Sequence, residues 1–532
     1  RTVSVPQQGY LVVSKRDARH YFHSLRIGRK WRRWLCGPPI AAEGNFQVGP
    51  QYPASVAAPM GFAPSAGWAQ GLTDVACIRA ELPTDRRVHP DSLAPETLPV
   101  WASICDDIWA LDHTEAAAPD PQDLVGPQWL DRTDEAWDAM GVVSHADKSL
   151  NGQLGGEIQG YFVHPHSHWI GVALQKRRHL IQCAFVLLGR KRVIFGDVDR
   201  LIGKFGFNHT ARPCLRSTFE VTFEWLNEQR EARARVVVIP DTVWLEICMA
   251  CLLLPFAQFC LSSPWSPRVE CSDSSMTGIG RSWAMFPIEV VTHMARLTDQ
   301  KGLYTNLSLP WGIGLNQSQR CPLRRLRFPR ERARWQHAGA PASPTFITLG
   351  EAAAATWVAE DRLRRPTDDN KRFVHPMDSA ACCGAFTKGR SKSRALNCYC
   401  KRLTSIKIAG GHEAFYPWIP SGDNPADIPS RYFEAPSAGT SKKSQPPAGD
   451  SISLDFEHVL HQPSIVYHFF IHLCAGSFRA TDLCSYVDSL SSLHGLSIVA
   501  IRIDPLSFVD IEGWPANCHG DLCNRKQGLH VL

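Results

Sequence analysis

The stretch ICDDIW, residues 104–109, places Asp106 and Asp107 side by side between apolar residues. The surrounding residues 100–112 are rich in β-branched and aromatic side chains, which predicts a strand or a hairpin. A buried carboxylate is costly unless a cation or hydrogen bonds compensate its charge. Divalent cations such as Mg²⁺ bind carboxylate oxygens, so we expect a metal at this pair and further acidic ligands elsewhere in the chain.

The chain has 532 residues, of which 44% are hydrophobic and 20% are charged. This composition is typical of globular proteins and excludes a disordered chain. At about 150 residues per domain, the length predicts three or four domains. The 18 cysteines follow no regular disulfide framework and no secretory signal precedes them, which indicates an intracellular location in the cytoplasm or the nucleus.

Two motifs contain residue types that bind zinc. The CxxC pair Cys248 and Cys251 lies in the apolar stretch EICMACLLLPFAQFCL, residues 246–261, and no second pair accompanies it. That stretch is shorter than the roughly 20 residues of a membrane span, so we expect a core helix, no zinc and no membrane partner. The alternating histidines of HPHSH, residues 164–168, are expected at the rim of a hairpin rather than at a metal.

Basic residues are clustered, although the net charge is only +6. The clusters are RIGRKWRR (26–33), QKRR (175–178), GRKR (189–192) and RCPLRRLRFPRERARW (320–335). Each of them alone is compatible with a solvated surface, but four clusters with interleaved aromatic residues favour a nucleic acid partner. The last cluster belongs to a long polar insertion at 299–345, which is either disordered or a loop that grips a duplex.

A third acidic residue follows the first strong strand signal. Residues 9–27 read GYLVVSKRDARHYFHSLRI, and Asp17 comes directly after their β-branched run. Adjacent strands can bring Asp17, Asp106 and Asp107 within the few ångströms that two Mg²⁺ ions require. A two-metal site stabilises both the attacking and the leaving oxygen in phosphoryl transfer.

A second acidic constellation lies further along the chain. RVECSDSSMTGIG (268–280) predicts a strand that delivers Asp273, and FITLGEAAAATWVAEDRL (346–363) predicts a helix that holds Glu351. RFVHPMDSAACCGAF (372–386) predicts a strand that delivers Asp378, and WIPSGDNPADIPSRY (418–432) predicts a loop that delivers Asp427. This set also fits two divalent ions.

The first constellation resembles reverse transcriptases: DARHYFH is similar to their motif A, APMGFAPS to motif B and ICDDI to motif C. The resemblance implies a right-hand polymerase palm in which Asp17 and Asp106 hold Mg²⁺ or Mn²⁺ and Asp107 supports them. It also implies that Phe22 excludes a ribose 2′-OH and that Gly61 lets the chain approach template and nucleotide. Lys148 is either near the incoming triphosphate or a surface lysine.

The second constellation, in the order D, E, D, D, resembles the RNase H active site. With KGRSKSRALN (388–397) and WIPSGDNPADIPSR, it is similar to retrotransposons of the DIRS type, over roughly residues 5–433. The implied partners are an RNA template, a DNA primer, an RNA/DNA hybrid and dNTPs. Residues expected to contact nucleic acid are Arg324, Arg325, Arg327, Lys388 and Arg390.

The expected fold is therefore an α+β and α/β multidomain protein. It comprises a ferredoxin-like palm (1–125), a thumb and connection (126–235), an RNase H-like mixed sheet with helices (236–433), a linker (434–460) and a partial Rossmann-like segment (461–532). In that last segment a glycine turn at Gly476 and the acidic Asp504 resemble an S-adenosylmethionine-dependent methyltransferase. A plain α/β fragment is the other reading of these residues.

Departures from the family patterns leave two rival functions. Ile104 and His20 replace residues that are common beside the polymerase motifs, and the loop IPSGDN (419–424), where the RNase H family often has a catalytic histidine, contains none. The chain starts sixteen residues before Asp17, so the fingers are expected to be missing, truncated or supplied by a partner chain. The alternatives to a reverse transcriptase are a nuclease of RNA/DNA hybrids and a degenerate or domesticated remnant that only binds nucleic acid.

Overall fold

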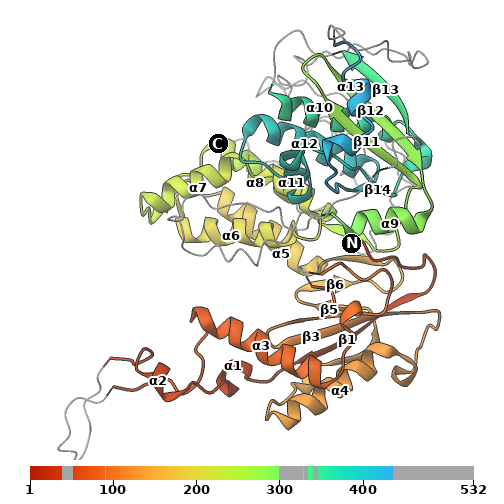
Figure 1. The fold of residues 1–532 in the computed structure, drawn as a ribbon. Helices are drawn as coiled ribbons and strands as arrows, with labels where there is room; N and C mark the ends of the chain where they lie inside the picture. The colour runs from red at the N-terminus through yellow and green to blue at the C-terminus, as the bar shows by residue number, and fades with distance from the viewer. Residues whose placement is uncertain are drawn as a thin grey trace, which may run out of the picture. The chain divides into compact units, whose positions relative to one another are not determined.

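The computed structural model describes residues 1–38, 52–60, 62–89, 92–298, 328, 333–339 and 346–434. The chain is a mixed α/β protein with several small sheets (Figure 1). Its contacts divide it into two compact units, and Arg1–Leu174 together with Gln258–Ser263 form the first unit. Gln175–Ala257 and the chain from Pro264 onward form the second unit.

Several predictions lie outside the described residues. They are the role of Gly61, the nucleic acid contacts of Arg324, Arg325 and Arg327, and the glycine turn and acid at Gly476 and Asp504. The expected linker beyond residue 434 and the S-adenosylmethionine-type segment at 461–532 lie outside them as well. These stay predictions from the sequence.

The first unit is built on a four-stranded antiparallel sheet in the order β2-β3-β1-β4. Its strands are β1 (Tyr10–Asp17), β2 (Val100–Ile104), β3 (Asp107–Thr114) and β4 (Leu150–Leu154). The register of β1 and β3 places Asp17 directly opposite Asp107. The expected hairpin is present, because β2 and β3 are joined by a two-residue turn at Cys105 and Asp106.

The two faces of this sheet differ. Side chains alternate along a strand, so Ile108 and Ala110 lie on one face and Leu111 lies on the other. The first face packs against α3 (Ala63–Arg79) and α4 (Val125–Ala139) in one apolar cluster. Leu11 and Val13 of β1 belong to a second cluster, which includes residues of a smaller sheet. By the same alternation, Asp17 and Asp107 lie on the face that α3 and α4 leave uncovered.

The smaller sheet of the first unit has the order β10-β7-β6-β5. The histidine-rich residues 164–168 join β6 to β7, so the predicted hairpin rim is confirmed. The strands of this sheet are β5 (Gly156–Ile158), β6 (Tyr161–Val163), β7 (Trp169–Val172) and β10 (Gln258–Cys260). The first unit also contains the short helices α1 (Tyr21–Ser24) and α2 (Arg29–Arg32) and the 3₁₀ turn η3 (Ala146–Lys148).

The second unit begins with a helical part that shares one apolar core. Cys251 is buried in this core, as the sequence predicts for a core helix. The elements are α5 (Leu174–Leu188), β8 (Val193–Ile194), α6 (Phe195–Asn208), η4 (Pro213–Thr218), α7 (Val221–Glu231), β9 (Val236–Val237) and α8 (Asp241–Leu253).

A three-stranded antiparallel sheet follows in the order β11-β12-β13, and β14 and β15 pair in parallel. Five buried alanines of the helix α10 (Ile347–Leu363) pack with α11 and α12 in a common core. The strands are β11 (Arg268–Ser274), β12 (Gly278–Met285), β13 (Arg334–Gly339), β14 (Arg372–Val374) and β15 (Glu413–Phe415), and the other helices are α9 (Ile288–Arg296), α11 (Ala380–Lys388), α12 (Arg394–Ala409) and α13 (Asp427–Ser430).

The division into units falls at Leu174 and again around Gln258–Ser263. The ranges 1–125, 126–235 and 236–433 that the sequence predicts divide the chain more finely than these two units, and they stay predictions. The helical part at 175–257 shares its core with Ile408 of α12, which explains why contacts group it with the later residues. No helix in the described part of the chain is long and apolar enough to cross a membrane.

We expect His209→Phe to stabilise the second unit. His209 is buried, and neither ring nitrogen has a hydrogen-bond partner among the described residues. Its ring stacks on Phe219 with 5.6 Å between centroids, so a phenyl ring fits the same apolar surroundings. Relieving two unsatisfied nitrogens is worth about 1–3 kcal/mol in the free energy of unfolding.

The gain from His209→Phe should grow as the pH falls. Burial lowers the pKa of His209 to about 3, whereas a histidine of the unfolded chain takes up its proton near pH 6.5. Stability is therefore lost progressively as the pH falls below about 6.5, by about 2 kcal/mol at pH 5. Urea unfolding at pH 7.5 and pH 5 measures this, with the exposed His293→Gln as control, and an equal gain at both pH values would contradict the prediction.

Candidate metal centre

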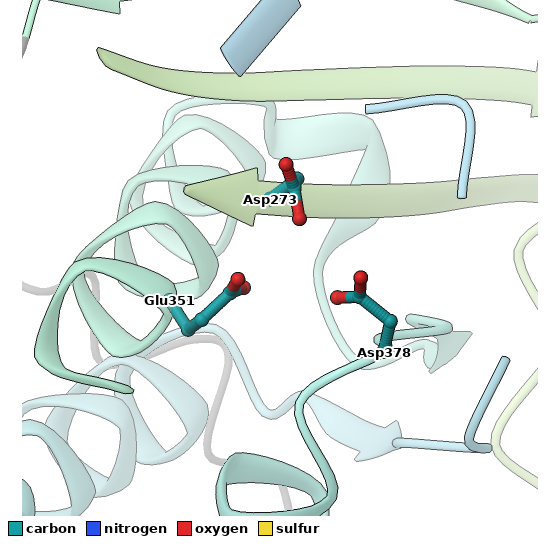
Figure 2. A group of neighbouring side chains, drawn as sticks. All are labelled: Asp273, Glu351 and Asp378. Atoms are coloured by element: carbon teal, nitrogen blue, oxygen red, sulfur yellow. The ribbon is translucent and has the colours of Figure 1, made fainter. Parts of the chain in front are cut away.

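Three carboxylates of the second constellation converge in the second unit. Asp273, Glu351 and Asp378 each offer a ligand oxygen, and these atoms lie within 4.8 Å of one another. Figure 2 shows the three side chains pointing toward one another from β11, from α10 and from the segment that follows β14. The predicted strand and helix placements of Asp273 and Glu351 are thus confirmed.

This acidic triad is shielded from water. Asp273 is 4% exposed and Glu351 is 6% exposed. Burial, followed by the charges of the neighbouring carboxylates, raises the pKa of Asp273 to about 7 and that of Glu351 to about 9. A site that holds two buried carboxylates with raised pKa values beside the half-buried Asp378 is one that a cation would strongly stabilise.

Hydrogen bonds orient part of the triad and leave the rest available. Asp273 accepts hydrogen bonds from Ser430 Oγ at 2.5 Å and from Asn424 Nδ2 at 3.5 Å. Glu351 Oε1 accepts one from the Ser274 backbone N–H at 3.3 Å. Glu351 Oε2 and Asp378 Oδ1 are buried and have no hydrogen-bond partner among the described residues. Such oxygens fit a hard divalent cation.

The fourth acidic residue, Asp427, lies at the start of α13 and not in a loop as the sequence predicts. The difference arises because residues 427–430 form one helical turn, which begins at Asp427 and includes Pro429. Its Oδ1 accepts a hydrogen bond from Arg431 Nε at 2.7 Å. Asp427 is not one of the three residues whose ligand atoms converge within 4.8 Å.

Two glycines let the helices approach β11 closely. Gly280 of β12 lies opposite Asp273, and a Cβ at this position would clash with the backbone of Ala426 and Ser430 around α13. Gly350 of α10 immediately precedes Glu351, and a Cβ there would clash with the Ser274 side chain. Glycine at both positions therefore allows the three segments to meet.

Gly280→Ala is expected to reduce the RNase H activity that the sequence resemblance implies by about 100-fold, because an ångström-scale displacement of catalytic groups has that order of effect. The new methyl group must push α13 away from β12, and with it Ser430, which orients Asp273 on the neighbouring β11. Cleavage of an RNA/DNA hybrid measures the loss. Gly339→Ala in β13 is the matched control, since its Cβ would meet only Phe433 Cε2 at 4.0 Å. Equal activity of the two variants would contradict the prediction.

The first constellation is brought to one end of the sheet in the first unit. Asp17 ends β1, Asp107 begins β3, and Asp106 lies in the turn before it. The turn is fixed at two points: the Asp106 carbonyl accepts a hydrogen bond from the Ala18 N–H at 2.9 Å, and the Cys105 N–H donates to Gln70 of α3 at 2.9 Å.

Two lysines lie against these carboxylates. Lys15 Nζ is 3.2 Å from Asp107 Oδ1, and Lys148 Nζ is 3.3 Å from Asp17 Oδ1. Burial raises the pKa of Asp107, and the nearby charge of Lys15 opposes the rise. In the described part of the chain, Asp273, Glu351 and Asp378 form the group of potential metal ligands whose ligand atoms all lie within 4.8 Å of one another. Asp17, Asp106 and Asp107 do not form such a group.

The other predicted site residues are placed as follows. Phe22 lies in α1, half-buried against the cluster under α3 and α4. Lys388 ends α11, and Arg390 follows it with its guanidinium 4.2 Å from the centre of the Phe223 ring. Lys148 is 57% exposed at the end of η3. Asn424 and Ser430 were not predicted from the sequence; their only signal is their place beside Asp427 in SGDNPADIPSR.

Comparisons with known proteins give distant structural likenesses. No protein-family model and no curated protein matches the chain. A foamy viral protease-reverse transcriptase bound to double-stranded DNA is 10% identical, with a TM-score of 0.35 over 78% of this chain and 58% of that chain. The foamy viral protease-reverse transcriptase in complex with an RNA/DNA hybrid is 11% identical, with a TM-score of 0.33 over 81% of this chain and 68% of that chain. The chain therefore spans little more than half of the first of these structures.

Proposed function

We propose that the chain is an RNA-directed DNA polymerase with RNase H activity from a retrotransposon of the DIRS type. The observation that carries the proposal is the convergence of Asp273, Glu351 and Asp378 within 4.8 Å in a buried site. Buried acidic groups with raised pKa values are costly to the fold and are typical of functional sites.

In the second unit the proposed reaction is hydrolysis of the RNA strand of an RNA/DNA hybrid. Asp273, Glu351 and Asp378 would hold Mg²⁺ or Mn²⁺, with Asp427 beside them. Two such ions, when bound, stabilise the attacking and the leaving oxygens of the phosphodiester. Ser430 and Asn424 orient the Asp273 carboxylate, and the Ser274 N–H orients Glu351.

In the first unit the proposed reaction is extension of a DNA primer on an RNA template. Asp17 and Asp106 would be the metal ligands, with Asp107 in support. The proposal is supported by the pairing of β1 with β3, which brings Asp17 directly opposite Asp107, with Asp106 in the adjoining turn. Phe22 would exclude ribonucleotides, Gly61 would face template and nucleotide, and Lys148 would meet the triphosphate.

The nucleic acid contacts complete the proposal. Lys388 and Arg390 follow the triad in sequence, and Arg324, Arg325 and Arg327 belong to the basic insertion. Binding through such residues should weaken steeply with salt, because phosphate contacts release counterions. The ranges 1–125, 126–235 and 236–433 for palm, thumb with connection and RNase H remain part of the proposal.

The proposal is tested with a labelled RNA/DNA hybrid and Mg²⁺, using the full chain, Asp273→Asn and Asp106→Asn. RNA cleavage should be lost only in Asp273→Asn, and primer extension should be lost only in Asp106→Asn. Cleavage without extension by any form would favour the hybrid nuclease, the first rival function. Salt-sensitive binding without either reaction would favour the remnant that only binds nucleic acid.

A further inference from the structure

Lys15 lies between the two carboxylates that face each other across β1 and β3. Its Nζ is 3.2 Å from Asp107 Oδ1 and 4.0 Å from Asp17 Oδ2. Lys15 comes two residues before Asp17 on the same strand, so both side chains leave the same face of the sheet. The residue opposite Lys15 is Trp109, which makes Asp107 its diagonal neighbour on β3.

The pairing of β1 and β3 creates an electrostatic problem that Lys15 solves. Asp17 lies directly opposite Asp107, and like charges at directly opposed positions destabilise a sheet. A long side chain can reach a diagonal neighbour, and Lys15 thereby places one positive charge between two negative ones. Its side chain is only 15% exposed, so water screens this interaction less than it screens a surface pair.

Lys148 differs from Lys15 in both respects. Its side chain is 57% exposed, and among the described carboxylates it pairs with Asp17, with Nζ 3.3 Å from Oδ1. It comes from a different segment, η3, rather than from the strand that carries Asp17. Lys15 is therefore the lysine that is held within the sheet, and its Nζ lies near both Asp17 and Asp107.

We propose that Lys15 is an internal counterion that occupies the position of a divalent cation between Asp17 and Asp107 and competes with that cation. Lys15 holds the Asp107 carboxylate and Lys148 holds Asp17 Oδ1, which leaves Asp106 as the first of the three carboxylates to be available to an ion. Lys15 is thus a positioning residue that weakens the binding of the free ion. The inference rests on the proposed polymerase function only for the identity of the competing cation.

The test measures Mn²⁺ binding by calorimetry on the full chain without nucleic acid. The parent carries Asp273→Asn and Glu351→Gln, so that the triad does not contribute to the signal. Lys15→Met in this parent is expected to bind Mn²⁺ on the order of tenfold more tightly, because one opposing charge at close range is removed. Lys15→Arg, which keeps the charge, should bind as the parent does.

Two controls locate the effect. Lys30→Met removes an exposed lysine of the same unit and should leave Mn²⁺ affinity unchanged. Asp17→Asn added to Lys15→Met should abolish the gain, because it removes the shared carboxylate. Should Lys15→Met fail to fold by circular dichroism, Lys15→Gln replaces it with a shorter neutral side chain.

The outcomes separate this inference from the proposed function. An unchanged or weaker affinity in Lys15→Met, or no Mn²⁺ binding in any form, overturns the role of Lys15. A tenfold gain supports it even where the full chain extends no primer, in which case the polymerase proposal fails alone. Primer extension by the full chain with unchanged affinity in Lys15→Met overturns the inference and leaves the polymerase proposal in place.

Discussion

Glu351→Gln is expected to lower the cleavage of an RNA/DNA hybrid by about 1,000-fold while raising the melting temperature of the protein. Glutamine keeps the size of glutamate, and its Oε1 can still accept the hydrogen bond from the Ser274 N–H. It carries no charge, so it would be a poor ligand for a divalent cation. The loss of several kcal/mol of transition-state stabilisation corresponds to about three powers of ten in rate.

The gain in stability follows from the direction of the pKa shift. Burial, followed by the charges of Asp273 and Asp378, raises the pKa of Glu351 to about 9. A raised pKa means that the fold is most stable with this carboxyl protonated. Stability is present below the unfolded-state pKa near 4.5 and is lost as the pH rises toward about 9. Glutamine removes this cost, about 3 kcal/mol at neutral pH.

Hybrid cleavage in Mg²⁺ and thermal unfolding in a chelator measure the two effects on the same preparation. Glu289→Gln is the matched control, because Glu289 is an exposed glutamate of the same unit and should change neither quantity. A variant that loses activity and also unfolds at a lower temperature would contradict the argument, since the loss would then reflect damage to the fold.

The sequence predicts which acidic residues matter better than it predicts how they are arranged. The order of Asp273, Glu351, Asp378 and Asp427 along the chain, with strand and helix signals around the first two, selects four candidate residues, of which three converge. The convergence of three of them within 4.8 Å depends on Gly280 and Gly350, whose missing side chains admit α13 and α10. A glycine in a sequence does not reveal which backbone approaches it.

In the first unit too, the sequence pattern predicts the strands, whereas the contacts between their side chains depend on the strand register. The apolar run before Asp17 and the residues around Asp106 predict strands, and both strands are present. Only the register shows that Asp17 faces Asp107, which makes Lys15 a neighbour of both. The division of the chain after Leu174 could not be predicted, because the core shared by α5–α8 with Ile408 joins residues about 200 positions apart in sequence.

Glu270→Gln is expected to lower the free energy of unfolding of the second unit by about 3–5 kcal/mol, the range for breaking one side of a buried ion pair. Glu270 accepts hydrogen bonds from Arg362 at 2.6 and 2.8 Å, from Arg365 at 2.7 Å and from Arg268 at 3.1 Å. The Arg362 side chain is 2% exposed, so the substitution leaves a buried guanidinium without its carboxylate.

The pH dependence of this loss has the sign opposite to that of Glu351. Burial alone would raise the pKa of Glu270, but the charges of Arg362, Arg365 and Arg268 outweigh it and lower the pKa to about 2. A lowered pKa means that the contribution to stability is present above about pH 4.5 and is lost as the pH falls toward 2. The difference between the parent and Glu270→Gln should therefore stay constant from pH 5 to 8 and shrink below pH 4.5.

Urea unfolding of the parent, Glu270→Gln and Glu351→Gln in a chelator tests both glutamates together. The same chemical change in one unit should destabilise at position 270 and stabilise at position 351, because arginines surround the first and carboxylates surround the second. Adding Arg362→Met to Glu270→Gln should restore part of the loss, since it removes the unpaired buried charge. If both single variants shifted stability in the same direction, the charges around one of the two glutamates would differ from those in the structure.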